Sequence, residues 1–130
     1  MIDKIAWLHL VDGRILSTRS RGKSVFYLPG GKREPGESDA ETLLREIREE
    51  LTVEIDPATI EPAGVFEAQA DGHASELLVR MTCYTGEFSG TLAASSEIDE
   101  VKWLGHTDRD RVSAVDKIIF DHLRDTGLLR

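Results

Sequence analysis

Residues 31–53 read GKREPGESDAETLLREIREELTV, and this stretch decides the fold. A polar segment leads into a capping box, in which Ser38 stands three residues before Glu41. Apolar residues then recur at helical spacing, namely Ala40, Leu43, Leu44, Ile47 and Leu51. The pattern predicts an amphipathic helix over residues 39–51.

The segment before this helix is predicted to be β-structure. Residues 4–11 alternate as in a strand, the Asp-Gly pair at 12–13 is a hairpin turn signal, and residues 15–20 form the return strand. Residues 25–28 predict a short apolar strand, which the Pro-Gly-Gly run at 29–31 stops.

Beyond the helix, the pattern returns to strands and then to a second helix. Residues 60–70 and 76–88 predict two long strands joined by a loop, and residues 101–104 predict a short strand. A second helix starts at Ser113 and ends before Gly127. This order predicts an α+β fold, an α/β/α sandwich in which a mixed β-sheet is packed between helices.

Composition limits the classes of protein that fit. The 130 residues suit a single domain over 1–130, and 24 acidic against 16 basic residues give a net charge of −8. That charge argues against nucleic-acid polymers or a membrane surface as partners, and no apolar run approaches the roughly 18–20 residues of a membrane span. The single cysteine, Cys83, excludes an internal disulfide and favours a cytoplasmic protein.

Carboxylates crowd one face of the predicted helix. At about 100° per residue, Glu46, Glu49 and Glu50 span about 100° of its circumference, beside the apolar stripe. Two carboxylates about 6 Å apart repel by roughly 3 kcal/mol at an effective dielectric near 20, and a bound Mg²⁺ turns that repulsion into attraction. The alternative is an ordinary solvated acidic face, which costs only a few tenths of a kcal/mol.

Glycines and basic residues precede this acidic face. Gly31 lets the backbone approach a ligand closely, so its carbonyl is a candidate metal ligand. The basic residues close to it in sequence are candidates for contacts to phosphate oxygens, with solvated surface charge as the alternative; they are Arg19, Arg21, Lys23, Lys32 and Arg33.

Residues 31–53 resemble the signature of the Nudix hydrolase family, G-x5-E-x7-R-E-U-x-E-E-x-G-U, in which U is a bulky aliphatic residue. The matching residues are Gly31, Glu37, Arg45, Glu46, Ile47, Glu49, Glu50 and Val53. Thr52 departs from the signature, because it stands where the family has its last glycine. That position follows the helix, where glycine commonly adopts a left-handed conformation, so the departure concerns the loop rather than the acidic set.

The resemblance implies an enzyme that cleaves the diphosphate linkage of a nucleoside diphosphate derivative by attack of water on phosphorus. It implies Mg²⁺ as cofactor, with Mn²⁺ as a substitute. The implied metal ligands are Gly31, Glu37, Glu46, Glu49 and Glu50. Glu46 and Glu49 are also the implied catalytic carboxylates, and Arg45 would orient a glutamate through a charge-assisted bond.

Relatives in this family often use a further acid from a later loop, and Glu97 and Glu100 are the two candidates here. The alternative for each is an exposed loop carboxylate. Phe26 and Tyr27 point to opposite faces of their predicted strand, so one of them is a candidate for stacking on a nucleobase, with core packing as the alternative.

The small size resembles the MutT-like branch of the family. This implies hydrolysis of a (deoxy)nucleoside triphosphate, including oxidised ones, to monophosphate and pyrophosphate. The alternatives are an ADP-ribose or nucleotide-sugar pyrophosphatase, and a non-catalytic nucleotide-sensing module. The expected partner is a small-molecule nucleotide, and the expected state is a monomer or homodimer.

Overall fold

The computed structural model describes residues 1–70 and 77–130. The strands are β1 (Ile2–Trp7), β2 (Leu10–Val11), β3 (Arg14–Ser20), β4 (Gly30–Gly31), β5 (Glu54–Ile55), β6 (Glu61–Gln69), β7 (Leu78–Thr85), β8 (Phe88–Ser89) and β9 (Ile98–Leu104). The helices are α1 (Asp39–Leu51), α2 (Ala114–Asp125) and two short 3-10 turns, η1 (Pro57–Thr59) and η2 (His106–Arg111). Neither α-helix in this described part has the length and apolar character that crossing a bilayer requires.

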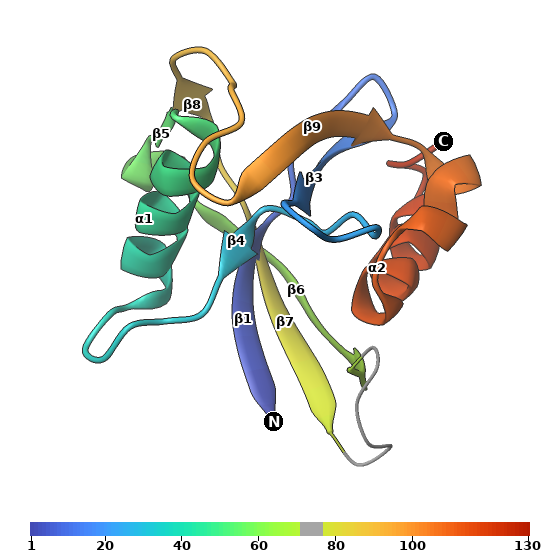
Figure 1. The fold of residues 1–130 in the computed structure, drawn as a ribbon. Coiled ribbons are helices and arrows are strands. Elements are labelled where there is room, and N and C mark those ends of the chain that lie inside the picture. The colour runs from blue at the N-terminus through green and yellow to red at the C-terminus, as the bar shows by residue number, and fades with distance from the viewer. Residues whose placement is uncertain (71–76) are drawn as a thin grey trace.

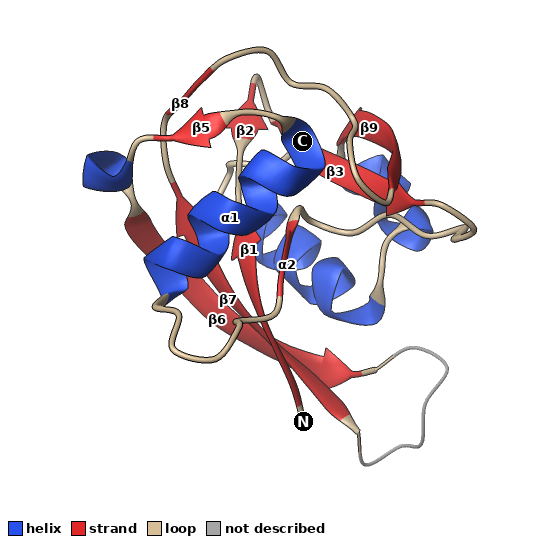
Figure 2. Ribbon diagram, turned by 60° about the vertical axis from the view of Figure 1, so that its left-hand side comes forward, coloured by secondary structure: helices blue, strands red, loops and turns tan. Residues whose placement is uncertain are grey.

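A mixed sheet occupies the centre of the molecule. Its strand order is β4-β1-β7-β6, with β1 parallel to β7 and the other pairs antiparallel. A second sheet has the order β2-β3-β9, and β5 pairs with β8. Helix α1 covers one side of the central sheet and α2 covers the other (Figures 1 and 2). The predicted α+β sandwich, with a mixed sheet between helices, is confirmed.

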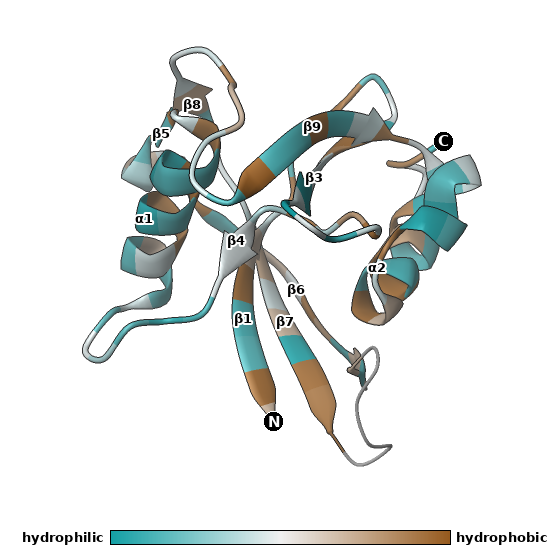
Figure 3. Cartoon of the chain, viewed as in Figure 1, coloured by the Kyte–Doolittle hydropathy of each residue, from teal (hydrophilic) through white to brown (hydrophobic). Residues whose placement is uncertain are grey.

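The core has two halves because β1 is buried on both faces. Ile5 and Trp7 point to the α1 side, where they pack with Ile47, and Ala6 on the other face packs with Phe120 of α2. Figure 3 shows hydrophobic segments along β1 and β7 and hydrophilic turns along both helices. Because successive side chains of β1 point to opposite faces of the sheet, one strand packs against both helices.

Helix α1 has the bounds that the sequence predicts. Ser38 Oγ accepts from Glu41 N–H at 3.1 Å, and Glu41 Oε1 accepts from Ser38 N–H at 2.9 Å, which completes the capping box. The helix ends at Thr52, whose φ of 62° is left-handed. The second helix also begins as predicted, with Ser113 as its N-cap.

The predicted strand over residues 4–11 is interrupted, because the chain passes there from one sheet to the other. Leu8 N–H still donates to Tyr84 O of β7 at 2.8 Å. The next residue, His9, already belongs to the second sheet, since its carbonyl accepts from Leu16 N–H of β3 at 2.9 Å.

The prediction of a strand at residues 25–28 is wrong. Phe26 and Tyr27 form isolated bridges, to Val112 and Thr18 respectively. Their neighbours belong to different parts of the fold, so no continuous ladder forms.

The glycines at 30–31, which were expected to stop a strand, themselves form β4 against β1. They fit there because they have no side chain. A Cβ on Gly30 would lie 2.0 Å from the carbonyl oxygen of Ile5.

The later strands agree with the sequence in type and differ in length. β6 and β7 lie within the predicted ranges. The second predicted strand ends at Thr85, and Phe88 belongs to the separate strand β8. β9 starts earlier than predicted, at Ile98. The loop expected at residues 71–75, with His73, lies outside the described residues.

Two neighbouring isoleucines of α2 test the packing of its inner face. Ile119 is fully buried and Ile118 is 42% exposed. We expect Ile119→Ala to lower the free energy of unfolding by about 2–5 kcal/mol, because it leaves a cavity in a closed core. Ile118→Ala is the matched control, with a loss below about 1 kcal/mol. Urea denaturation measures both, and equal losses would contradict the assigned burial.

Candidate active site

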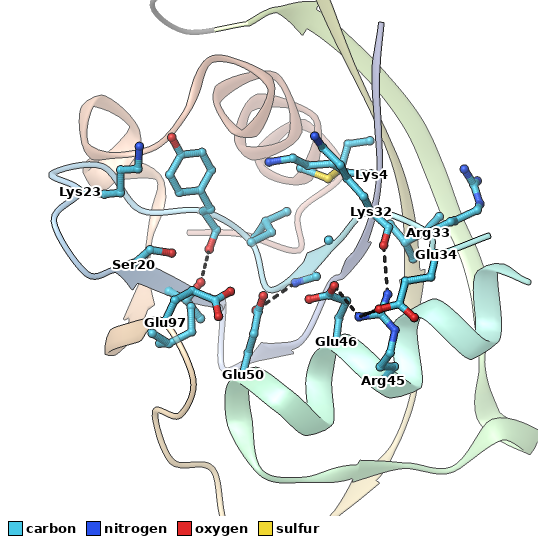
Figure 4. Close-up of a pocket in the computed structure, with 18 residues that line it drawn as sticks. Lys4, Ser20, Lys23, Lys32, Arg33, Glu34, Arg45, Glu46, Glu50 and Glu97 are labelled. Carbon is cyan, nitrogen blue, oxygen red and sulfur yellow. Dashed lines mark hydrogen bonds and ion pairs between the residues drawn. The ribbon is translucent and has the colours of Figure 1, made fainter. Parts of the chain in front are cut away.

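A cavity of about 570 Å³ opens beside β4, between α1 and the segments that flank β3 and β9. Its floor is acidic, with Glu46 and Glu50 from α1 and Glu97 from the loop before β9 (Figure 4). Its rim is basic, with Lys4, Lys23 and Lys32. The cavity therefore combines carboxylate oxygens on its floor with lysine ammonium groups on its rim.

Strand β4 forms the wall next to the helix because glycine permits close approach. A Cβ on Gly31 would lie 2.5 Å from Cδ of Glu46. On the preceding residue, Gly30 N–H donates to Glu50 Oε1 at 3.2 Å. The backbone of β4 thus lies close to both floor carboxylates that α1 contributes, which are one turn apart on the helix.

Arg45 holds the acidic residues in place. Its guanidinium lies 2.7 Å from Glu37 Oε2, 2.9 Å from Glu46 Oε1 and 3.5 Å from Glu49 Oε2. The bond from Arg45 lowers the pKa of Glu37 to about 2. Arg45 also donates to Lys32 O at 3.1 Å, so it links α1 to the loop that precedes it.

Glu50 is the most unusual of these carboxylates. The residue is buried, with only 5% of its surface exposed. Burial, followed by the charges of Glu46 and Glu97, raises its pKa to about 9, although the bond from Gly30 N–H acts in the opposite direction. Burial also raises the pKa of Glu46. Without a cation, the two adjacent carboxylates therefore favour holding a proton.

The two candidate late acids lie in different places. Glu97 lines the cavity and is near enough to Glu50 to raise its pKa. Glu100 lies outside the cavity lining, and its Oε1 accepts from Arg19 Nε at 3.3 Å. Arg19 is turned the same way, since it also pairs with Asp99 at 3.5 Å.

The other predicted substrate contacts divide in the same manner. Lys32 and Tyr27 line the cavity. Phe26 is 2% exposed and belongs to the α2 side of the core, beneath the guanidinium of Arg111. Glu37 and Glu49 stand outside the lining and reach it through Arg45.

Sequence reasoning named Lys23 among the candidates for phosphate contacts, but it missed Lys4 as a cavity residue. Lys4 comes from β1, and its Nζ lies 5.4 Å from the centroid of the Tyr27 ring. Within the described residues, Lys4, Lys23 and Lys32 form no ion pair with a carboxylate, although the chain is strongly acidic. The alternation of β1 could have suggested Lys4, but no local pattern shows which loop it faces.

A second, smaller cavity of about 110 Å³ adjoins the first. The two share Lys4, Tyr27 and Met81 in their walls. The hydroxyl of Ser113, at the start of α2, is buried and has no hydrogen-bond partner among the described residues. This cavity is lined mainly by apolar groups, so its chemistry differs from that of the first.

The chemistry of the donor set fits a hard divalent cation. Glu50 is a buried carboxylate beside Glu46, both are oxygen donors, and their raised pKa values fall when a cation replaces the proton. Within the described residues, no three acidic, histidine or cysteine side chains already form a metal cage. Glu46 accepts from Arg45 at 2.9 Å through Oε1, which is one of its two carboxylate oxygens.

The NUDIX domain family model matches residues 5–122. The chain belongs to the Nudix family. A CTP pyrophosphohydrolase of Escherichia coli (strain K12) is 33% identical to this Nudix protein over 99 residues, which cover 72% of this chain and 69% of that protein.

Solved structures share the same Nudix fold. The E. coli ORF135 protein has a TM-score of 0.73 and 27% identity, covering 95% of this chain and 91% of that one. A MutT protein from Methanosarcina mazei Go1 has a TM-score of 0.76 and 22% identity, covering 97% and 94% of the two chains. The protein is a Nudix pyrophosphohydrolase, a class that generally uses a divalent metal.

The raised pKa of Glu50 predicts how stability depends on pH. Without metal, burial raises the pKa of Glu50 in the folded protein to about 9, from an ordinary value of 4.5. The free energy of unfolding therefore falls as pH rises between those values. In EDTA at pH 8, we expect Glu50→Gln to raise the melting temperature by about 5 °C, since about 1 kcal/mol shifts it by several degrees in domains of this size.

Thermal melts from pH 5 to pH 9 measure this effect. Glu61→Gln on the exposed part of β6 is the matched control and should leave the pH dependence unchanged. A wild-type melting temperature that rises with pH over this range would contradict the assignment to Glu50.

Proposed function

We propose that this Nudix pyrophosphohydrolase converts a (deoxy)nucleoside triphosphate, including oxidised forms, to the monophosphate and pyrophosphate, with Mg²⁺ as cofactor and Mn²⁺ as a substitute. One observation carries the proposal. The acidic floor of Glu46, Glu50 and Glu97 shares one cavity with three rim lysines that form no ion pair with a carboxylate of the described residues. A polyphosphate that carries a divalent cation is complementary to both surfaces.

The α1 residues hold the metal in this proposal. Glu46 and Glu50 offer carboxylate oxygens, and Gly31, which lies close to Glu46, offers its carbonyl. Glu37 and Glu49 complete the set through Arg45. When bound, the metal neutralises phosphate charge and lowers the pKa of a coordinated water. Arg45 keeps Glu46 oriented through its 2.9 Å bond.

Glu97 is the proposed general base. It lies on the cavity floor near Glu50, on a loop rather than among the proposed ligands of the helix. It accepts a proton from the attacking water as the new O–P bond forms and the bridging P–O bond breaks. The departing pyrophosphate takes the electron pair of that bond, and the rim lysines stabilise its charge.

The nucleoside is expected to extend toward the second cavity. Tyr27 and Met81 separate the two compartments and offer an aromatic face and a polarisable side chain to a base. The buried hydroxyl of Ser113 offers a donor and an acceptor there. Similarity to the CTP pyrophosphohydrolase of E. coli makes CTP the first nucleotide to test.

A nucleotide panel tests the reaction. We expect release of pyrophosphate from one or more triphosphates with Mg²⁺ or Mn²⁺, and none in EDTA, because the metal neutralises the phosphates and activates the water. Glu46→Gln and Glu50→Gln should lower kcat by at least about 10²-fold while the proteins stay folded, because each removes a ligand charge. Ion chromatography of the products provides the measurement.

The panel includes ADP-ribose and nucleotide sugars, and Glu54→Gln is the control variant. Glu54 pairs with Arg48 on the outer surface of α1, 2.6 Å away, and lies outside the cavity lining. Turnover of a diphosphate conjugate alone would replace the proposed substrate. Tight nucleotide binding without turnover would indicate a sensing module instead.

The two late acids give a sharper test of the base. Because Glu97 lines the cavity and Glu100 is turned to Arg19, we expect Glu97→Gln to lower kcat by about 10²-fold or more, as loss of a general base does. Glu100→Gln should lower it by less than about threefold, the scale of a rim change. Steady-state rates with saturating Mg²⁺ measure both, and a larger loss in Glu100→Gln would reverse the assignment.

A further inference from the structure

The loop that carries Glu97 is bound to the end of α1 in a regular way. Glu50 O accepts from Ser95 N–H at 3.0 Å, and Leu51 O accepts from Ala93 N–H at 3.0 Å. One residue further, Thr52 Oγ1 donates to Thr91 O at 3.1 Å. Three consecutive residues at the helix end thus meet alternate residues of the loop, and we call this set of bonds the helix-end clamp.

The clamp leads directly into the active site. The hydrogen bond of the clamp that lies nearest the cavity joins Ser95 to Glu50, whose side chain is part of the cavity floor. Two residues beyond Ser95, Glu97 turns into the same cavity, and its carbonyl accepts from Arg21 N–H at 2.8 Å. The last residues of the loop are therefore held by backbone hydrogen bonds at Ser95 and at Glu97. The distance between Glu50 and Glu97 depends on the clamp.

Thr52 is the residue of the clamp that departs from the family signature. Its φ of 62° lies in the left-handed region, where a β-branched residue is strained and glycine is not. Glycine at this position would relieve the strain but has no hydroxyl to reach Thr91. The chain thus retains a strained residue whose side chain makes the outer bond of the clamp.

We infer that Thr52 is a positioning residue, whose hydroxyl fixes the loop of residues 90–97 and thereby sets Glu97 against Glu50. The inference rests on the proposed role of Glu97. It concerns the chemical step and leaves substrate binding unchanged, because the rim residues Lys4, Lys23 and Lys32 lie on other segments.

Substitutions at Thr52 separate the hydroxyl from the backbone conformation. We expect Thr52→Gly to fold and to lose about five- to tenfold in kcat with an unchanged KM, because a small displacement of a reacting group is costly. Thr52→Ser keeps the hydroxyl and should restore most of the rate. Thr126→Gly is the matched control, since Thr126 caps α2 with its own hydroxyl bond, to His122 O at 3.1 Å, away from the cavity.

Two further measurements connect the effect to Glu97. Thr52→Gly should cost little in a Glu97→Gln background, because the group that it displaces is already absent. Amide hydrogen exchange at Ala93 and Ser95 should be faster in Thr52→Gly than in wild type or in Thr52→Ser.

The outcomes distinguish this inference from the proposed function. Wild-type kcat in Thr52→Gly, equal losses in the Ser and Gly variants, or full additivity with Glu97→Gln would each overturn the positioning role in an active enzyme. If no nucleotide is turned over, the proposed function fails, and hydrogen exchange alone still tests the clamp. Unchanged exchange in Thr52→Gly would then overturn the inference.

Discussion

The narrow space between β1 and α1 is the constraint on which the rest of the structure depends. Strand β4 passes through it, and a side chain on either of its residues would collide, with the carbonyl of Ile5 at Gly30 and with Glu46 at Gly31. Two glycines allow the backbone to pair with β1 and to contact the acidic helix at once. The central sheet, helix α1 and the cavity all contact this strand. A displacement of the cavity residues therefore requires a displacement of the sheet or the helix.

The acidic floor illustrates a conflict between stability and function. Burial and neighbouring charge raise the pKa of Glu50, which means that its ionised form is unfavourable in the folded, metal-free protein. Arg45 offsets part of the crowding by bonding Glu37 and Glu46. A bound cation would relieve the remainder, so the same electrostatic cost that weakens the metal-free fold would favour metal binding.

Several features follow from short-range pattern and were predicted correctly. The capping box and the apolar spacing define α1, and the box residues identify the family, because these signals act over one or two turns of a helix. The break after Leu8, the isolated bridges of Phe26 and Tyr27, and the glycine strand β4 were not predicted. Each depends on which distant segment lies alongside, and local periodicity carries no information about that.

The sequence by itself determined helix α1, its acidic face and the Nudix family, since all three are encoded in contiguous residues. It left Glu97 and Glu100 equivalent and did not indicate Lys4. Only the tertiary structure distinguishes the positions of the two acids, because Arg19 of β3 pairs with Glu100 outside the cavity lining while Glu97 lines the cavity. Such choices are made by contacts between residues far apart in the chain, where packing and charge pairing act together.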